Sequence, residues 1–339
     1  SENNPFFSVS LLPYQAPRFD VIDVSHYRPA FDEGVRRQRA EIAAIVNSPQ
    51  PADFANTLEA LEQSGQLLAR VTNVFFAMAG AETNPTIQAL DEQFSAELAE
   101  LANDIWLNDA LFQRVKRVWE QRDSLSLEAE SRRLLEVTWQ RFTLAGAMLE
   151  DEQKAALRAL NTEAAALQSQ FQQRLLAAVK SGGLVVEDVH QLAGLSDEEI
   201  SAAAEAAQEK GISGRWLLPL LNTTQQPALL SLQDRQTREN LFAAGWTRNQ
   251  KGDTNDTREL VLRLAEIRAR KAQLLGADDF ASWSMADQMA GAPGEAFTFM
   301  RRIAPTARAR AEQELADIQQ VIDNEGGDFR AAAWDWLYY

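Results

Sequence analysis

The residues in this sequence that could carry out chemistry are few. Its 339 residues include two histidines, His26 and His190, and no cysteine. The lack of cysteine excludes disulfides, thiolate nucleophiles and every zinc site with cysteine ligands. Neither histidine lies in an H-x-x-x-H or H-E-x-x-H pattern, which would place two imidazoles on one helix face for a metal ion. Much catalytic chemistry is therefore excluded, and a three-histidine metal site is impossible here, whereas the abundant carboxylates leave an acid/base pair open.

Structural roles explain the two histidines better than chemical ones. His26 precedes a helical pattern, so we expect it to form a hydrogen bond where that helix starts. His190 follows Glu187 and Asp188, and without a second imidazole such a cluster indicates a solvated loop. A Ser-His-Asp system would need a serine beside one of them, and the G-x-S-x-G turn that presents such a serine is absent. No glycine-rich phosphate loop occurs either.

Two polar segments are further candidates. Residues 222–226 (NTTQQ) follow an apolar run and could offer amide groups to an extended peptide, although a connecting loop is the simpler interpretation. Four arginines between residues 301 and 310 lie near Glu312, Glu314 and Asp317. That pattern is typical of a solvated helix face with ion pairs. The residues that would bind a substrate stay unknown.

Charge and composition limit the partners. Lys plus Arg number 33 against 49 Asp plus Glu, so the formal net charge is -16, which disfavours nucleic acids and anionic membrane surfaces. The first residues lack a basic stretch followed by an apolar run, and no apolar segment approaches the length of a membrane span. We therefore expect a cytoplasmic protein. The length allows about two domains or one large layered domain.

The elements that must position these residues are mainly helices. Apolar residues recur at helical spacing from Ile87 to Ile105, behind an N-cap and first-turn proline at Asn84 and Pro85. The same spacing runs from Leu157 to Ala178 and ends at the glycines 182 and 183. If Phe171 on that stripe is fully buried, its truncation to alanine should cost about 3–5 kcal/mol.

Three shorter patterns complete the helical prediction. Leu58, Leu61, Leu68 and Phe75 form one more stripe, with Gly65 on the same face, where a neighbouring helix could approach closely. Residues 196–199 (SDEE) form a capping box, and a further helix is predicted to start at residue 256. The carboxylates of residues 197–199 suit the first turn of a helix, where they interact favourably with the helix dipole.

Strand patterns occur only near residues 183–186 and 216–221, both short apolar runs. Pro219 cannot donate to a ladder, so it places the second run at an edge or a bulge. We predict a mainly α protein with a small antiparallel β-ribbon near 183–221. No fixed-period repeat indicates a solenoid.

The last residues are unusually aromatic. Trp334, Trp336, Tyr338 and Tyr339 occur in the final six positions, whereas natural chain ends are usually polar. We therefore expect the sequence to be interrupted here and the rings to be covered by a part that is missing.

Several motifs resemble the zinc-dependent oligopeptidase family that includes thimet oligopeptidase, neurolysin, oligopeptidase A and the bacterial peptidyl-dipeptidases. The N-terminal pattern is PRFDVI at 17–22, followed by HYRPAF at 26–31. Segments closer to the peptidyl-dipeptidase branch are LEQSG at 61–65, LDEQFS at 90–95, SGGLVV at 181–186 and LNTTQQPAL at 221–229. Motifs shared more widely are TRENLF at 237–242, KAQLLG at 271–276 and AWDWLYY at 333–339.

The resemblance implies a fold and a division of labour. It covers the whole chain, residues 1–339, but only the N-terminal half of such an enzyme, a multi-helix region that forms one wall of a deep channel for unfolded peptides. In the family a downstream H-E-x-x-H helix binds zinc with a further glutamate, and its own glutamate is the general base. None of those residues has a counterpart here, so no catalytic residue is carried over.

By resemblance, then, the full-length protein is a zinc metallopeptidase that removes C-terminal dipeptides from peptides. We expect this segment to bind no zinc, to be inactive alone, and to need the missing C-terminal catalytic half as its partner. The terminal aromatics would pack against that half. The alternative is a non-enzymatic helical scaffold or peptide-binding module, since a fold does not fix a function. An enzyme that uses carboxylates of this segment alone has no supporting constellation.

Overall fold

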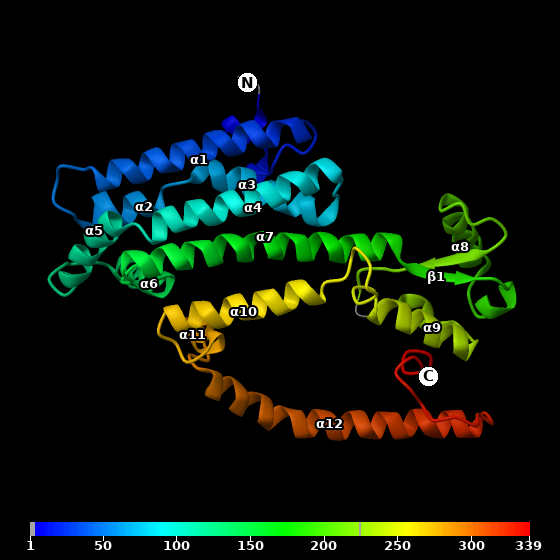
Figure 1. Cartoon of the computed structure of the whole chain (residues 1–339). Helices are drawn as coiled ribbons and strands as arrows, with labels where there is room; N and C mark the ends of the chain where they lie inside the picture. Colours follow the sequence, from blue (N-terminus) through cyan, green and yellow to red (C-terminus); the bar gives the residue numbers. More distant parts are fainter. Residues whose placement is uncertain (1–3, 224) are drawn as a thin grey trace. The chain divides into compact units, whose positions relative to one another are not determined.

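The computed structural model describes residues 4–223 and 225–339, which form two compact units (Figure 1). Unit 1 comprises residues 1–170 and 264–287, and unit 2 comprises residues 171–263 and 288–339. Residues 1–3 and Thr224, the latter within the polar segment 222–226, lie outside the described residues. No helix in the described part is long and apolar enough to cross a bilayer.

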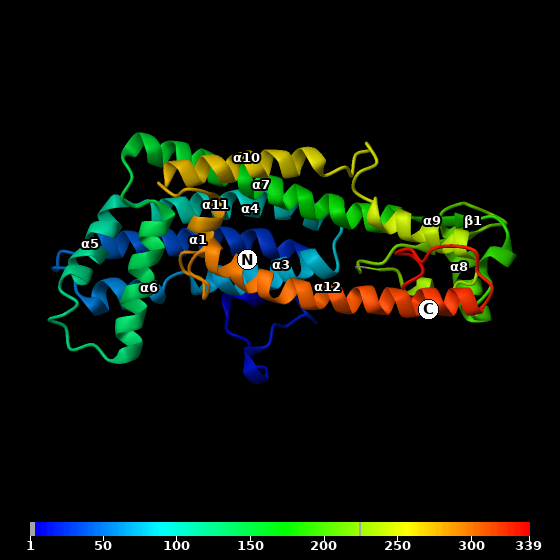
Figure 2. The same cartoon turned by 90° about the horizontal axis from the view of Figure 1, so that it is seen from below.

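Unit 1 is a bundle of helices (Figures 1 and 2). Its elements are α1 (Val24–Val46), a π-helical turn (Phe54–Glu59), α2 (Ala60–Glu62), α3 (Gln66–Ala81), α4 (Pro85–Trp106), α5 (Asp109–Glu120), α6 (Ala129–Ala145), the first part of α7 (Asp151–Ser181), the last part of α10 (Arg258–Leu274) and α11 (Phe280–Met285). The short 3-10 turns Pro5–Phe7 and Pro13–Gln15 precede α1.

The core of unit 1 is built on aromatic rings from α1, α3 and α4. Phe31 and Phe94 stack with their centroids 3.9 Å apart, and Phe75 meets Phe94 edge-on at 4.7 Å. All three side chains are 0% exposed. Aromatic pairs in such geometries add stability beyond the area that they bury, so these rings fix how the three helices cross.

The helix predicted from Ile87 to Ile105 is confirmed as α4. The Asn84 side chain accepts hydrogen bonds from the amides of Thr86 and Ile87, and Pro85 occupies the first turn. Ile87 and Ile105 are both buried in the core of unit 1. The cap and the apolar stripe predicted this element because each depends only on local sequence.

The stripe from Leu58 to Phe75 is not one helix, although its four apolar residues are all buried in the core of unit 1. Gly65 has φ +77°, in the left-handed region, and lies in the turn before α3, where its amide donates to Glu41 of α1 at 2.8 Å. As predicted, a neighbouring helix lies close to Gly65, since an added Cβ there would lie 2.6 Å from the Gln38 side chain of α1. A second close approach occurs at Gly34 of α1, where an added Cβ would lie 2.9 Å from Leu68 Cα.

α7 bears out the second predicted helix, which ends at Ser181 before the glycines. Leu157 and Ala178 on its stripe are buried, but Phe171 is only half-buried. The condition attached to its truncation is therefore not met, and the cost should fall below that of a core phenylalanine.

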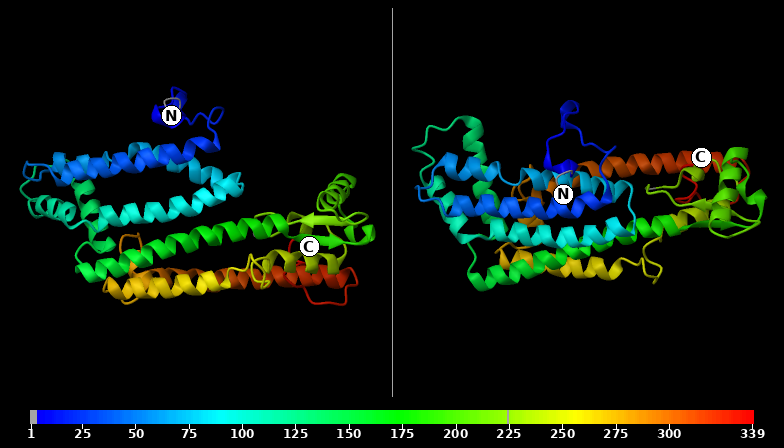
Figure 3. Two further views of the ribbon diagram at one scale, coloured as in Figure 1. Left: turned by 45° about the horizontal axis from the view of Figure 1, so that its top comes forward. Right: turned by 90° about the horizontal axis from the view of Figure 1, so that it is seen from above.

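Unit 2 contains the predicted β-ribbon. Its elements are the end of α7, β1 (Gly183–Val186), α8 (Asp197–Glu209), β2 (Trp216–Pro219), α9 (Arg235–Trp246), the start of α10 and α12 (Pro293–Asn324), with 3-10 turns at Val189–Leu192 and Pro227–Leu230. β1 and β2 pair antiparallel, with Gly183 opposite Pro219 and Val186 opposite Trp216. Pro219 thus ends its strand, as the edge prediction required, and Figure 3 shows the ribbon directly after α7.

The core of unit 2 lies where the ribbon meets α8 and α9. Val186, Leu218 and Leu241 are buried there, and Leu337 packs against them from the last residues of the chain. The predicted capping box starts α8, with Ser196 and Glu199 bonding each other's amides at 3.2 and 2.7 Å. α10 starts at Arg258, two residues after the predicted start.

Candidate functional site

His26 has the structural role predicted for it, although it lies inside the first turn of α1. Its Nδ1 accepts a hydrogen bond from the Asp23 amide at 2.9 Å, while the Asp23 side chain accepts from Ser25. This reciprocal cap satisfies amides that would otherwise lack partners at the helix start.

His190 lies exposed in the 3-10 turn Val189–Leu192, whose amide at His190 donates to Asp188 at 2.9 Å. The prediction of a solvated loop is confirmed. The arginines of α12 also behave as predicted, since Arg308 pairs with Glu312 at 2.8 Å and Arg310 with Glu314 at 2.9 Å on an exposed face.

No group of three or more His, Cys, Asp or Glu side chains in residues 4–223 and 225–339 could hold a metal ion. The residues described here therefore do not fit a zinc ion, which needs three or four such ligands in tetrahedral geometry.

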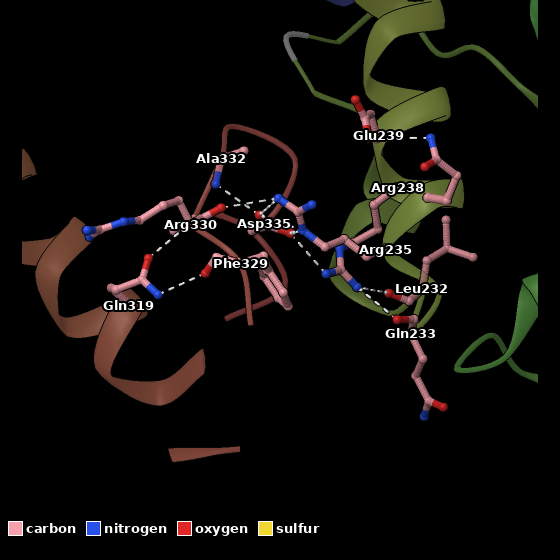
Figure 4. Close-up of polar contacts among 12 residues, drawn as sticks. Leu232, Gln233, Arg235, Arg238, Glu239, Gln319, Phe329, Arg330, Ala332 and Asp335 are labelled. Carbon is pink, nitrogen blue, oxygen red and sulfur yellow. Dashed lines mark hydrogen bonds and ion pairs between the residues drawn. The ribbon is translucent and has the colours of Figure 1, made fainter. Parts of the chain in front are cut away.

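The most constrained polar group in unit 2 is the Asp335 cluster, which consists of Asp335, Arg235 and Arg238 (Figure 4). Both arginines lie in the first turn of α9, whose N-cap is Asp234. The Asp335 carboxylate accepts from Arg235 Nη2 at 2.9 Å and from Arg238 Nη2 at 3.0 Å. The side chains of Asp335 and Arg238 are 0% and 1% exposed, and that of Arg235 is 31% exposed.

The backbone completes this cluster. The Ala332 amide donates to Asp335 at 2.9 Å, and Arg238 Nη1 donates to the carbonyls of Leu232 and Gln233 at 2.8 and 3.1 Å. A buried ion pair needs further hydrogen bonds to its remaining groups, and these bonds supply them except at Arg238 Nε, which is buried without a partner among the described residues. These bonds fix the last residues of the chain against the first turn of α9.

Electrostatics keep this carboxylate ionised. Burial by itself would raise the pKa of Asp335, but hydrogen bonds from Arg235, from the Ala332 amide and from Arg238 outweigh it, so the pKa is lowered. A carboxylate whose two oxygens accept this many bonds has no free lone pair to serve as a base. Asp335 is therefore a positioning group.

The terminal aromatics surround the same cluster. The Arg238 guanidinium lies 4.1 Å from the Tyr338 ring centroid, and that of Arg235 lies 5.5 Å from the Trp334 ring. Trp334, Trp336, Tyr338 and Tyr339 are all half-buried. Arginines and α9 of unit 2 thus cover part of the rings, and the expectation that a missing part covers the rest stays a prediction.

The end of α12 brings this segment into place. After α12 ends at Asn324, Gln319 reaches forward to the returning chain, accepting from the Ala331 amide at 2.9 Å and donating to the Phe329 carbonyl at 3.0 Å (Figure 4). The Phe329 ring then lies 4.2 Å from the Arg235 guanidinium. One glutamine and one aspartate thus hold residues 329–335 at two points.

A pocket of about 400 Å³ opens at the other end of α9, and we call it the Trp246 pocket. Its lining residues are Thr223, Gly245, Trp246, Arg248, Asn249, Gln250, Thr257 and Arg258. Trp246 is 58% exposed, and Phe242 links it to the aromatic block, with centroids 5.5 Å from Trp246 and 6.0 Å from Trp334.

The two arginines of this pocket differ in their partners. Arg258 forms a bidentate pair with Asp256, at 2.6 Å for the shortest contact, and this pair lowers the pKa of Asp256. Arg248 donates to the Gly245 carbonyl at 3.1 Å and makes no ion pair within the described residues. The pocket therefore presents an open indole face and one unneutralised guanidinium, which together suit the apolar groups and carboxylates of a peptide.

The polar segment 222–226 contributes to this pocket only in part. Thr223 lines it, whereas Gln226 is 3% exposed and turns back, with its side-chain amide accepting from the Leu221 N–H at 2.7 Å and donating to the Leu221 carbonyl at 3.1 Å. Gln226 thus closes the loop. Sequence reasoning missed Trp246 and Arg248, although a tryptophan and an arginine in a polar run just after a helical pattern were a usable signal.

The known proteins to which this chain is similar are peptidases. Residues 228–339, which include α9, α12 and the Asp335 cluster, match the model of Peptidase family M3. The chain is similar over almost its whole length to the N-terminal half of a dipeptidyl carboxypeptidase of this family, so the resemblance seen in the motifs is confirmed.

Individual relatives show how the similarity is distributed. The dipeptidyl carboxypeptidase of Salmonella typhimurium is 64% identical over 336 residues, which are 99% of this chain and 49% of that protein. The protein of the same description from Escherichia coli is 63% identical over the same coverage, and oligopeptidase A of Escherichia coli is 24% identical over 333 residues. The chain spans about half the length of these relatives.

Proposed function

We propose that this chain is the N-terminal part of a cytoplasmic zinc metallopeptidase that removes C-terminal dipeptides from peptides. The observation that carries the proposal is the 64% identity to a dipeptidyl carboxypeptidase over 99% of the chain. At this identity the two chains share a fold and the packing of its helices. The alternative of a non-enzymatic scaffold has no comparable support.

The proposal assigns the chemistry to residues outside this chain. Hydrolysis of a peptide by a zinc enzyme needs a metal-bound water and a general base, and the described residues provide no ligand group for zinc. The C-terminal catalytic half would supply both, and zinc would bind there. The 339 residues by themselves would be inactive.

The proposed contribution of this chain is to form one wall of the substrate channel. The Trp246 pocket supports this role, since an exposed indole and a guanidinium without an ion pair can bind an extended peptide without specificity for one side chain. The Asp335 cluster would keep the aromatic residues 334–339 in position for contact with the catalytic half. The role proposed for this segment is thus to control which peptides enter the channel, and not to catalyse their hydrolysis.

Reconstitution tests the proposal. The purified chain, supplied with zinc, should release no dipeptide from an N-blocked tetrapeptide, and addition of a separately purified C-terminal half should restore release. Turnover by the chain alone, persisting after repurification, would overturn the division of labour. Failure of the two halves to produce dipeptides, although they associate and zinc is bound, would overturn the proposed activity.

A further inference from the structure

Unit 1 contains a second pocket, about 340 Å³ in volume, that the channel-wall role does not use. We call it the Arg141 pocket. It lies where α1, the turn before α3, α4 and α6 meet. Its walls are mostly aliphatic: Leu61, Leu68, Leu98, Leu101, Ile105 and Leu134. Such walls with a few polar groups at fixed positions are typical of small-molecule sites.

Two oppositely charged side chains lie at this pocket without partners. Arg141 of α6 and Glu62 of α2 both line it and both are exposed. Among the described residues, neither side chain makes a hydrogen bond or an ion pair, with the other or with a third group. This contrasts with Arg133 on the same helix, which pairs with Glu136 at 3.0 Å.

The guanidinium of Arg141 is held in place by an aromatic ring. It lies 3.9 Å from the Trp106 ring centroid, a close cation–π contact. Surrounding protein atoms desolvate Arg141 and lower its pKa, while the charge of Glu62 acts in the opposite direction. The cation is therefore partly stripped of water but keeps free N–H donors, so an anion that reaches it gains more than it would in bulk water.

A hydroxyl adds a third group without a protein partner. Thr138 of α6 is 8% exposed, lines the pocket, and its hydroxyl makes no hydrogen bond to any described residue. A hydroxyl at the pocket wall can donate a hydrogen bond to a bound ligand or accept one from it. Cation, anion, hydroxyl and aliphatic wall thus converge on one cavity.

We propose that the Arg141 pocket binds a small apolar zwitterion, a free amino acid or a dipeptide, with its carboxylate on Arg141, its ammonium on Glu62 and its aliphatic side chain against Leu101 and Ile105. A ligand with only one charge would leave the other protein charge without a partner. This inference is independent of the proposed peptidase function, because it requires no catalysis.

Ligand analogues test the pocket on the unaltered 339-residue chain. Calorimetric titration should show saturable binding of L-leucine or of L-leucyl-L-leucine. The one that binds more tightly shows whether the ligand is a free amino acid or a dipeptide. 4-Methylpentanoate, which lacks the ammonium, and L-leucinamide, which lacks the carboxylate, should each bind about tenfold or more weaker. The proposal is overturned if neither zwitterion binds up to about 10 mM, or if either single-charge analogue binds as tightly as leucine.

Variants locate the site. Arg141→Met should weaken binding of the preferred zwitterion about tenfold or more, and Glu62→Gln should weaken it while leaving the affinity for 4-methylpentanoate unchanged. Arg133→Gln on the same helix is the matched control and should bind normally. The indole N–H resonance of Trp106, assigned with Trp106→Phe, should shift on titration. Binding that persists unchanged in both pocket variants would place the ligand elsewhere and refute the assignment.

Discussion

Arg238 and Asp335 are 97 residues apart in sequence and meet at 3.0 Å, with neither side chain more than 1% exposed. Replacing Asp335 by Asn leaves a buried guanidinium without its anion, which should cost about 3–5 kcal/mol of unfolding free energy. Urea denaturation followed by circular dichroism measures this cost. Glu312→Gln removes an exposed ion pair and is the control, expected to change the unfolding free energy by less than about 1 kcal/mol. A small effect of Asp335→Asn would mean that the cluster does not stabilise unit 2.

The same carboxylate predicts a pH dependence. Because the folded-state pKa of Asp335 is lowered, its contribution to stability is fully present above the unfolded-state value of about 3.9 and is lost as the pH falls through the folded-state pKa. The difference in unfolding free energy between wild type and Asp335→Asn should therefore be constant near neutral pH and shrink below about pH 4. A difference that grows on acidification would contradict the sign of the shift.

Helix crossing in unit 1 should depend on Gly34. A methyl group there would lie 2.9 Å from the backbone of Leu68, so Gly34→Ala should destabilise by about 1–3 kcal/mol despite the better helix propensity of alanine. Gly80→Ala in α3 is the matched control, since nothing lies within 4 Å of the added methyl. It should be neutral or stabilising by up to about 1 kcal/mol. Thermal unfolding of the two variants in parallel tests the contrast.

Two phenylalanines should differ in their cost of truncation. Phe94→Ala removes a ring that is 0% exposed and stacked on Phe31, for which we expect a loss of about 3–5 kcal/mol. Phe171→Ala removes a half-buried ring and should cost less than that. Equal costs, measured by urea denaturation, would show that Phe171 is buried more deeply in solution.

Trp246 should contribute to peptide binding in the assembled enzyme. If its exposed indole contacts the substrate, Trp246→Ala should raise KM about three- to tenfold with little change in kcat. Leu230→Ala is the control, because Leu230 is 56% exposed in the same unit and does not line the Trp246 pocket. A fall in kcat with unchanged KM would point to misplacement of the catalytic half and away from substrate contact.

Local sequence predicted the parts of the fold that depend on near neighbours. The Asn84 cap, the capping box at Ser196, the end of α7 and the ribbon all follow from residues within a few positions of one another. The stripe through Gly65 predicted buried residues but not the break in the helix, because helical periodicity continued across a left-handed turn that only the positive φ reveals.

The candidate site was less predictable because it joins distant residues. Nothing near Asp335 in sequence identifies Arg235 and Arg238 as its partners, about a hundred positions earlier. The aromatic ending was recognised as unusual, but its cation–π contacts depend on how residues 329–335 turn back after α12. The lining of the Trp246 pocket likewise joins Thr223, the end of α9 with the residues after it, and residues 257 and 258, which meet only in three dimensions. Trp246 and Arg248 are two positions apart, so these two could have been found from local sequence.

The two units are not consecutive stretches of chain, because unit 1 takes residues 264–287 from beyond the first part of unit 2. That returning piece places the Trp283 indole N–H on the Leu144 carbonyl at 2.8 Å and Leu275 against Gly146. During translation, the first part of unit 1 emerges without this returning piece. The surface that the piece covers therefore stays exposed until nearly a hundred more residues have left the ribosome. A chaperone that binds nascent apolar surface has its best opportunity in that interval.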